Sequence, residues 1–146
     1  MQKIKTDLLE LIKQGEIFIS SSIESELSYK PYPHKWSKKE ILGHLIDSGI
    51  NNLQRFTEIQ FCQKPYKIRQ YNQDELVIAN QYQKSNIKEL LNIWLAINTR
   101  IIHVIDNLSD ESSSFEILIE DKIFDLRFLI EDYVVHMRHH LKQIFS

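Results

Sequence analysis

The 146-residue chain has little of what several protein classes require. It contains one cysteine, three glycines and three prolines, and no hydrophobic run approaches the roughly 20 residues that cross a bilayer. The single cysteine, Cys62, cannot form an internal disulfide, and so few glycines and prolines argue against the many tight turns of a β-sandwich or barrel. These shortages exclude a disulfide scaffold and a membrane-spanning protein, and they favour helices.

The chain also lacks an excess of charge of either sign. Eighteen Lys and Arg residues face 20 Asp and Glu residues, and they are interspersed rather than gathered into a basic stripe. A nucleic-acid partner is therefore not expected. Residues 1–7 lack the apolar segment of a signal peptide, which together with the lone cysteine predicts a cytoplasmic protein. With 42% hydrophobic residues, residues 1–146 can form one domain around one core.

Hydrophobic residues recur every three to four positions in four segments, about residues 4–23, 37–61, 85–108 and 126–144. This period is typical of amphipathic helices. Ser37 with Glu40 three residues later forms a capping box at the start of the second segment, and Asp125 can cap the fourth. The sequence thus predicts an all-α four-helix bundle.

The segments between the helices differ in character. Residues 63–82 are polar and contain Pro65, which predicts a long connection with room for a short helix after Asp74. Residues 109–114 are interpreted as a polar linker, and residues 115–124 alternate in a way that is compatible with a short β-hairpin before the last helix.

Three histidines are candidate metal ligands. His136 and His140 lie four residues apart, so both rings project from one face of the last helix, and His44 lies on the core side of the second helix. Three histidines from two facing helices would leave an open coordination position on a divalent transition metal. Six histidines in one chain make the spacing a weak signal, and hydrogen-bonded core histidines explain it equally well. The residue types alone leave both interpretations open.

Other candidate residues have less specific signals. Asp47 and Asp132 are spaced so that each could accept a proton from a ligand imidazole and orient it, although helix-surface positions explain them as well. His34, His103 and His139 are expected at the surface, and Cys62 receives no role. The long connection contains three possible substrate contacts, Tyr66, Tyr71 and Tyr82. No glutamate follows His136, so the zincin peptidase motif is absent.

Two segments, residues 36–47 (WSKKEILGHLID) and 126–144 (LRFLIEDYVVHMRHHLKQI), resemble the DinB-like (YfiT-like) superfamily of metal-dependent enzymes. The resemblance implies a four-helix bundle in which His44, His136 and His140 bind the metal, and it implies dimers. Known relatives include transferases and isomerases that use bacillithiol, mycothiol or glutathione, while many members have no assigned reaction. Asp125 stands where relatives often have threonine, and both residues can cap a helix.

These observations predict a metal-dependent enzyme. The leading hypothesis is a thiol-dependent S-transferase or a hydrolase that acts on a small electrophilic substrate. Zinc or nickel is the preferred ion, with iron or copper as further options, and a low-molecular-weight thiol is the expected cosubstrate. The alternative is a non-catalytic, stress-associated metal-binding bundle. A third reading is a metal-free homodimer whose histidines satisfy one another.

Overall fold

Four long helices run side by side in the computed structural model, which describes residues 1–146. They are α1 (Gln2–Ser21), α3 (Lys38–Glu58), α5 (Ile87–Asp106) and α7 (Leu126–Phe145). Helices α3 and α1 each pack against both α5 and α7, so the four form a ring around one core. The predicted all-α four-helix bundle is confirmed.

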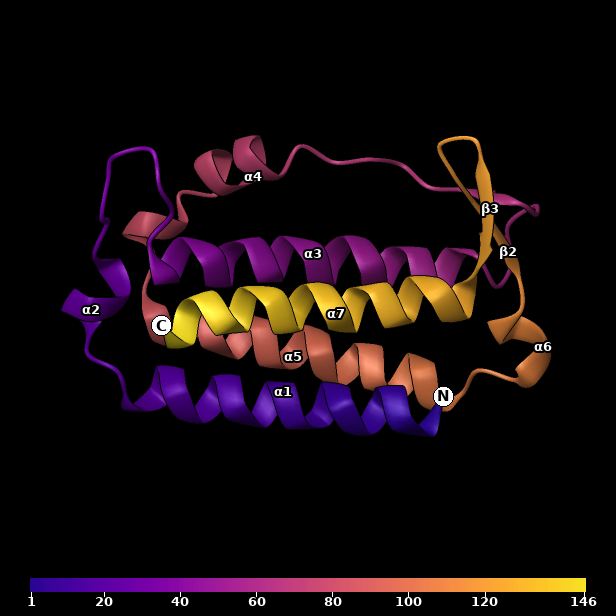
Figure 1. Ribbon diagram of the computed structural model, residues 1–146, viewed down its shortest axis with the longest axis horizontal. Coiled ribbons are helices and arrows are strands. Elements are labelled where there is room, and N and C mark those ends of the chain that lie inside the picture. The colour runs from indigo at the N-terminus through magenta and orange to yellow at the C-terminus, as the bar shows by residue number, and fades with distance from the viewer.

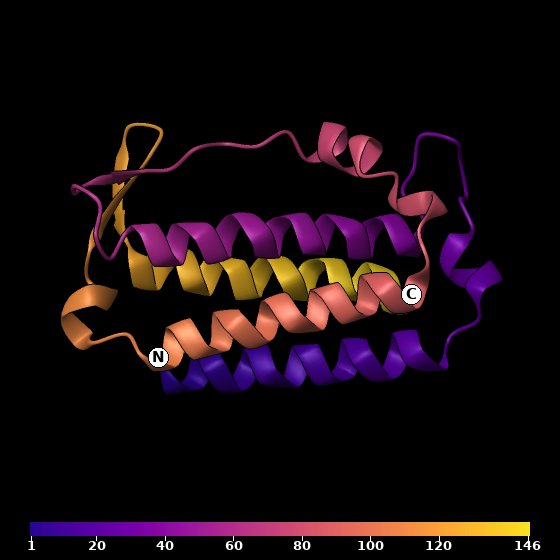
Figure 2. The same cartoon turned by 180° about the vertical axis from the view of Figure 1, so that it is seen from behind.

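The direction of the helices follows from one long crossover (Figures 1 and 2). After α3 the chain returns along its outer side, so α3 and α5 run parallel, and α1 and α7 run parallel in the opposite sense. The crossover carries strand β1 (Tyr66–Lys67), helix α4 (Gln73–Ala79) and the 3₁₀ helix η1 (Tyr82–Lys84). The predicted long connection and its short helix are thus present, and α4 packs against α3.

Some of the short strands and helices between the long helices agree with the sequence prediction, and others differ from it. Strands β2 (Glu116–Ile119) and β3 (Lys122–Asp125) form the predicted antiparallel hairpin, and β1 adds to it in parallel. The linker interpretation of residues 109–114 was wrong, because α6 (Asp110–Ser113) forms there with Ser109 as its cap. The first helix is also shorter than predicted, since α1 ends at Ser21 and a separate helix α2 (Glu24–Ser28) follows.

Both predicted helix caps form. The Ser37 hydroxyl accepts a hydrogen bond from the Glu40 backbone N–H, and the Glu40 carboxylate accepts one from the Ser37 N–H, completing the capping box of α3. Asp125 accepts from the Phe128 N–H at 2.8 Å and caps α7. These caps fix the first turns of the helices that carry the candidate ligands.

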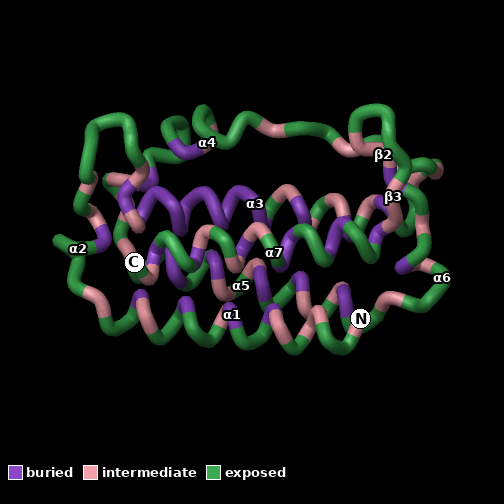
Figure 3. The backbone as a smooth tube through the Cα atoms, in the orientation of Figure 1, coloured by how far each residue is buried: buried purple, intermediate pink, exposed green.

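The first half of α3 is buried on all sides. Every residue from 39 to 49 is buried (Figure 3), because α5 and α7 cover its inner face while α2, α4 and η1 cover its outer face. Gly49 allows the close approach of α5: a β carbon there would lie 2.8 Å from Ile97 Cγ2. The polar side chains in this stretch are therefore enclosed and need partners inside the protein.

No helix in this bundle combines the length and apolar character needed to cross a membrane.

Candidate metal centre

The three predicted ligands meet between α3 and α7. His44 projects from α3, and His136 and His140 project from adjacent turns of α7. One ring nitrogen of each lies within 4.8 Å of the others, and His44 Nε2 is 3.0 Å from His136 Nε2. The ring centroids are 4.5 to 4.9 Å apart.

The donor atoms fit a divalent transition metal. Metal–nitrogen bonds of about 2.0–2.1 Å at tetrahedral or octahedral angles place two ligand nitrogens roughly 3–3.4 Å apart. The 3.0 Å between the Nε2 atoms of His44 and His136 meets this requirement, and a ring nitrogen of His140 lies within 4.8 Å of both. Two neutral Nε2 atoms that face each other can share only one proton, whereas one ion accepts both lone pairs. The spacing of the donor atoms therefore fits a cation.

The surroundings keep these histidines neutral. Burial lowers the pKa of His44 to about 3, with further lowering by repulsion from His140 and His136. Burial lowers the pKa of His136 to about 4, again assisted by repulsion from His140 and also from His139. Burial also lowers the pKa of His140. At neutral pH the ligand lone pairs are thus free to bind a metal.

The residues that orient the imidazoles differ from those predicted. Gln143 Oε1 lies 2.8 Å from His140 Nδ1, and Ser48 Oγ lies 3.4 Å from His136 Nδ1. His44 Nδ1 has no hydrogen-bond partner, and its ring packs against Trp36 with centroids 5.0 Å apart. Ser48 is four residues after His44 and Gln143 three after His140, so helical spacing could have indicated both.

Neither predicted carboxylate contacts a site histidine. Asp132 is exposed at the surface of α7. Asp47 is buried and turned toward the crossover, where its Oδ1 accepts hydrogen bonds from Tyr82 Oη at 2.6 Å and Asn80 Nδ2 at 3.2 Å. Burial raises the pKa of this carboxyl group. Asp47 anchors the crossover to α3 and does not orient a ligand.

Tyr82 is also placed differently from the prediction that it contacts substrate. It is buried, and its ring lies so close to Gly43 that a β carbon there would come 2.1 Å from the ring. Tyr66 donates to Glu58 at 2.7 Å, and Tyr71 stacks beneath the Arg55 guanidinium. These tyrosines support the crossover.

Replacing Tyr82 with phenylalanine should loosen this anchor. The change leaves the buried Asp47 carboxyl with only Asn80 as a partner, since its Oδ2 already has none. We expect a loss of about 1–3 kcal/mol in the free energy of unfolding, measured by urea denaturation. Tyr29→Phe, at an exposed position, is the control and should change nothing. Equal stability of Tyr82→Phe and wild type would contradict the anchoring role.

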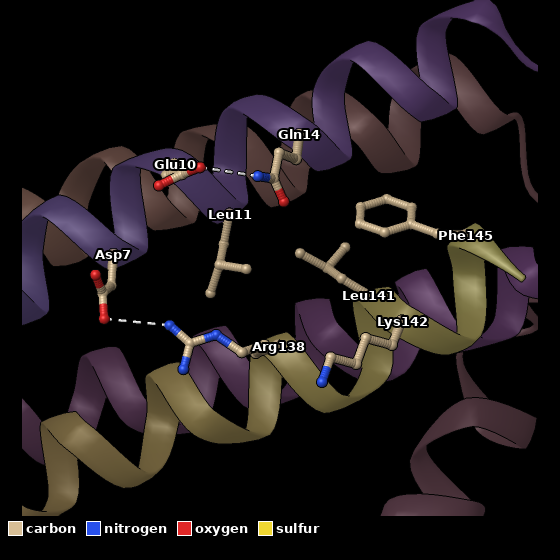
Figure 4. Close-up of a pocket in the computed structure, with 8 residues that line it drawn as sticks. All are labelled: Asp7, Glu10, Leu11, Gln14, Arg138, Leu141, Lys142 and Phe145. Carbon is tan, nitrogen blue, oxygen red and sulfur yellow. Dashed lines mark hydrogen bonds and ion pairs between the residues drawn. The ribbon is translucent and has the colours of Figure 1, made fainter.

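The remaining candidates lie outside the cluster. His34, His103 and His139 are exposed, as predicted, and Cys62 is half-buried. A cavity of about 290 Å³ lies between α1 and α7 (Figure 4), on the opposite side of α7 from the ligands. Its Arg138 and Asp7 pair with each other at 3.2 Å.

A larger cavity of about 500 Å³ adjoins the metal centre. It lies between the loop that precedes α3 and the first turn of α4, and its wall includes Lys35, Asp74 and Ile41. Two further wall residues touch the ligands directly: Trp36 packs on His44, and Gln143 hydrogen-bonds His140. Trp36 and Gln143 therefore line the cavity and also contact the ligand histidines.

Solved structures of similar fold include two Bacillus subtilis proteins. YfiT, described as a probable metal-dependent hydrolase with an unusual four-helix bundle topology, matches with a TM-score of 0.87 and 20% identity over 99% of this chain and 83% of that one. The DinB-like protein YjoA matches with a TM-score of 0.69 and 17% identity over 98% and 87% of the two chains. A mycothiol-dependent maleylpyruvate isomerase matches with a TM-score of 0.73 and 13% identity over 96% of this chain and 59% of its own.

The sequence comparisons give the family. No curated protein matches the sequence. Residues 18–144 match the model of the DinB superfamily. This range includes all three clustered histidines and most of the chain. The chain belongs to the DinB superfamily.

Proposed function

We propose that this protein is a metal-dependent enzyme whose ion is held by His44, His136 and His140. The observation that carries the proposal is the convergence of three neutral imidazoles without a fourth histidine, cysteine or carboxylate in the cluster. Structural zinc sites are closed by four protein ligands, whereas catalytic sites keep a position open. A bound zinc or nickel ion would supply a Lewis acid that lowers the pKa of a water molecule or a thiol.

The side chains around the cluster would position the reactants. Gln143 accepts from His140 Nδ1 and leaves Nε2 free to ligate, and Trp36 packs against the His44 ring. The adjoining cavity of about 500 Å³ is within the range of small-molecule sites and lies between these two side chains. We infer that the substrate binds there, with α4 as one wall.

The reaction class is the finer part of the proposal. A thiol-dependent S-transfer or a hydrolysis of a small electrophile fits an open three-histidine site, since both need a nucleophile that is deprotonated near neutral pH. The descriptions of YfiT as a probable metal-dependent hydrolase and of the isomerase as mycothiol-dependent support these two classes.

Metal content and turnover measured on the same untagged preparations test the proposal. Wild type should contain about one zinc or nickel ion per chain by plasma mass spectrometry, and it should consume small electrophiles from a panel with water or added thiol. His136→Ala/His140→Ala should lose both the metal and the turnover. His103→Ala removes an exposed histidine outside the cluster and should keep both.

Two outcomes would overturn the proposal in different ways. Wild type without metal after incubation with zinc and nickel would overturn the metal centre itself. Wild type with metal but without turnover across the panel would leave a metal-binding bundle and overturn the enzymatic assignment.

A further inference from the structure

Polar side chains form a line along α3 that leads away from the metal centre. Ser48 lies one turn after His44, Asn52 lies one turn after Ser48, and Arg55 follows. Ser48 and Asn52 are only 1% and 6% exposed. Burying such groups is costly unless they hydrogen-bond, so their partners define what the line does.

The contacts connect one metal ligand to the crossover. Ser48 Oγ lies 3.4 Å from His136 Nδ1, and Asn52 Nδ2 lies 3.4 Å from the same Oγ. A shorter bond of 2.9 Å from Asn52 Nδ2 to the Ser48 carbonyl fixes the Asn52 side chain. Arg55 Nη1 donates to Asn52 Oδ1 at 3.5 Å, and its Nη2 donates to the Arg69 carbonyl at 2.7 Å.

Metal binding through Nε2 would require one tautomer of His136. A histidine that ligates through Nε2 carries its proton on Nδ1 and needs an acceptor there. Ser48 Oγ is the hydrogen-bond partner of His136 Nδ1 in the structure. Asn52 holds Ser48 in place by donating to it, and Arg55 holds Asn52 through the amide oxygen.

We propose that Ser48 and Asn52 are positioning residues that fix His136 with its proton on Nδ1 and its lone pair on Nε2, while Arg55 connects them to the crossover. Arg55 also stacks on the Tyr71 ring at 5.4 Å, so the guanidinium is held by two residues of the crossover. The crossover that forms one wall of the cavity is thereby linked to a metal ligand. This inference rests on the proposed metal centre for its functional meaning.

Two measurements test the positioning role. The first is the His136 tautomer in the metal-free protein, from long-range ¹H–¹⁵N correlations of its imidazole. Wild type should show the Nδ1-protonated form, and Ser48→Ala should show a mixture because the acceptor is gone. The second is zinc affinity by chelator competition, which should fall about 10-fold or more in Ser48→Ala and by a smaller factor in Asn52→Leu.

Conservative and matched variants separate positioning from packing. Ser48→Thr keeps the hydroxyl and should restore both the tautomer and the zinc affinity. Ser113→Ala removes an equally buried hydroxyl in α6, where it bonds the Asp110 carbonyl, and should change neither readout. Equal tautomer populations and zinc affinities in Ser48→Ala and wild type would overturn the inference. If wild type binds no zinc, the metal proposal fails, and the tautomer measurement still decides whether Ser48 orients His136.

Discussion

Zinc or nickel at about a thousand times its dissociation constant should raise the melting temperature of the wild-type protein by roughly 8–16 °C. An ion that binds only the folded state at that excess adds about 4 kcal/mol, and a chain of this size shifts by about 2–4 °C per kcal/mol. Binding requires α3 and α7 to be in place together, because His44 comes from one and His136 and His140 from the other. Unfolding separates the ligands and releases the ion.

His44→Ala should remove about two thirds or more of this shift. The variant keeps only the two histidines of α7, and loss of one ligand should weaken binding on the order of 100- to 1000-fold. Scanning calorimetry with and without metal, followed by excess chelator, measures the effect. His103→Ala is the control, because His103 is an exposed histidine of α5 outside the cluster, and its shift should equal that of wild type. A shift of equal size in His44→Ala would place the ion elsewhere.

The features that the sequence predicts correctly are those with a local signal. The helices are predicted by an apolar period that repeats over five or more turns. The caps at Ser37 and Asp125 are predicted from residues next to the helix starts. The histidine cluster needed one further step, because the i,i+4 spacing on α7 is local but the approach of His44 is not. That step came from the resemblance of two segments to a known superfamily, which the family match confirms.

Two features that escaped prediction depend on partners far along the chain. Strand β1 consists of two residues, and it forms because Tyr66 pairs with Ile117 of β2. Asp47 has the right spacing to orient an imidazole, yet its carboxyl group instead accepts a hydrogen bond from Tyr82, which lies 35 residues later in the crossover. Helical periodicity predicts the face of a helix on which a side chain lies. The hydrogen-bond partner of that side chain depends on the packing of the whole structure.

Acidification should destabilise the metal-free protein between about pH 6.5 and pH 3, more steeply than exposed carboxylates alone would cause. The pKa of His44 is about 3 and that of His136 about 4 in the folded state, against 6.5 for an unperturbed histidine. Between these values the unfolded chain binds more protons than the folded one, so the free energy of unfolding falls as the pH falls. His140, whose pKa is also lowered, acts in the same direction.

The expected slope is about 1–3 kcal/mol per pH unit near pH 5, because His44 and His136 together bind up to two further protons on unfolding. Asp47 opposes this trend. Its pKa is raised in the folded state, so its protonation favours the folded state as the pH falls. Urea denaturation at several pH values in the presence of chelator measures the slope.

His44→Gln/His136→Gln removes two of the groups that take up protons on unfolding and should flatten the dependence, even if its stability at pH 7 is lower. His34→Gln/His103→Gln changes the same number of histidines at exposed positions and should keep the wild-type slope. If both double variants showed the wild-type slope, the acid response would come from other groups, and the cluster would not be the desolvated, neutral donor set that metal binding requires.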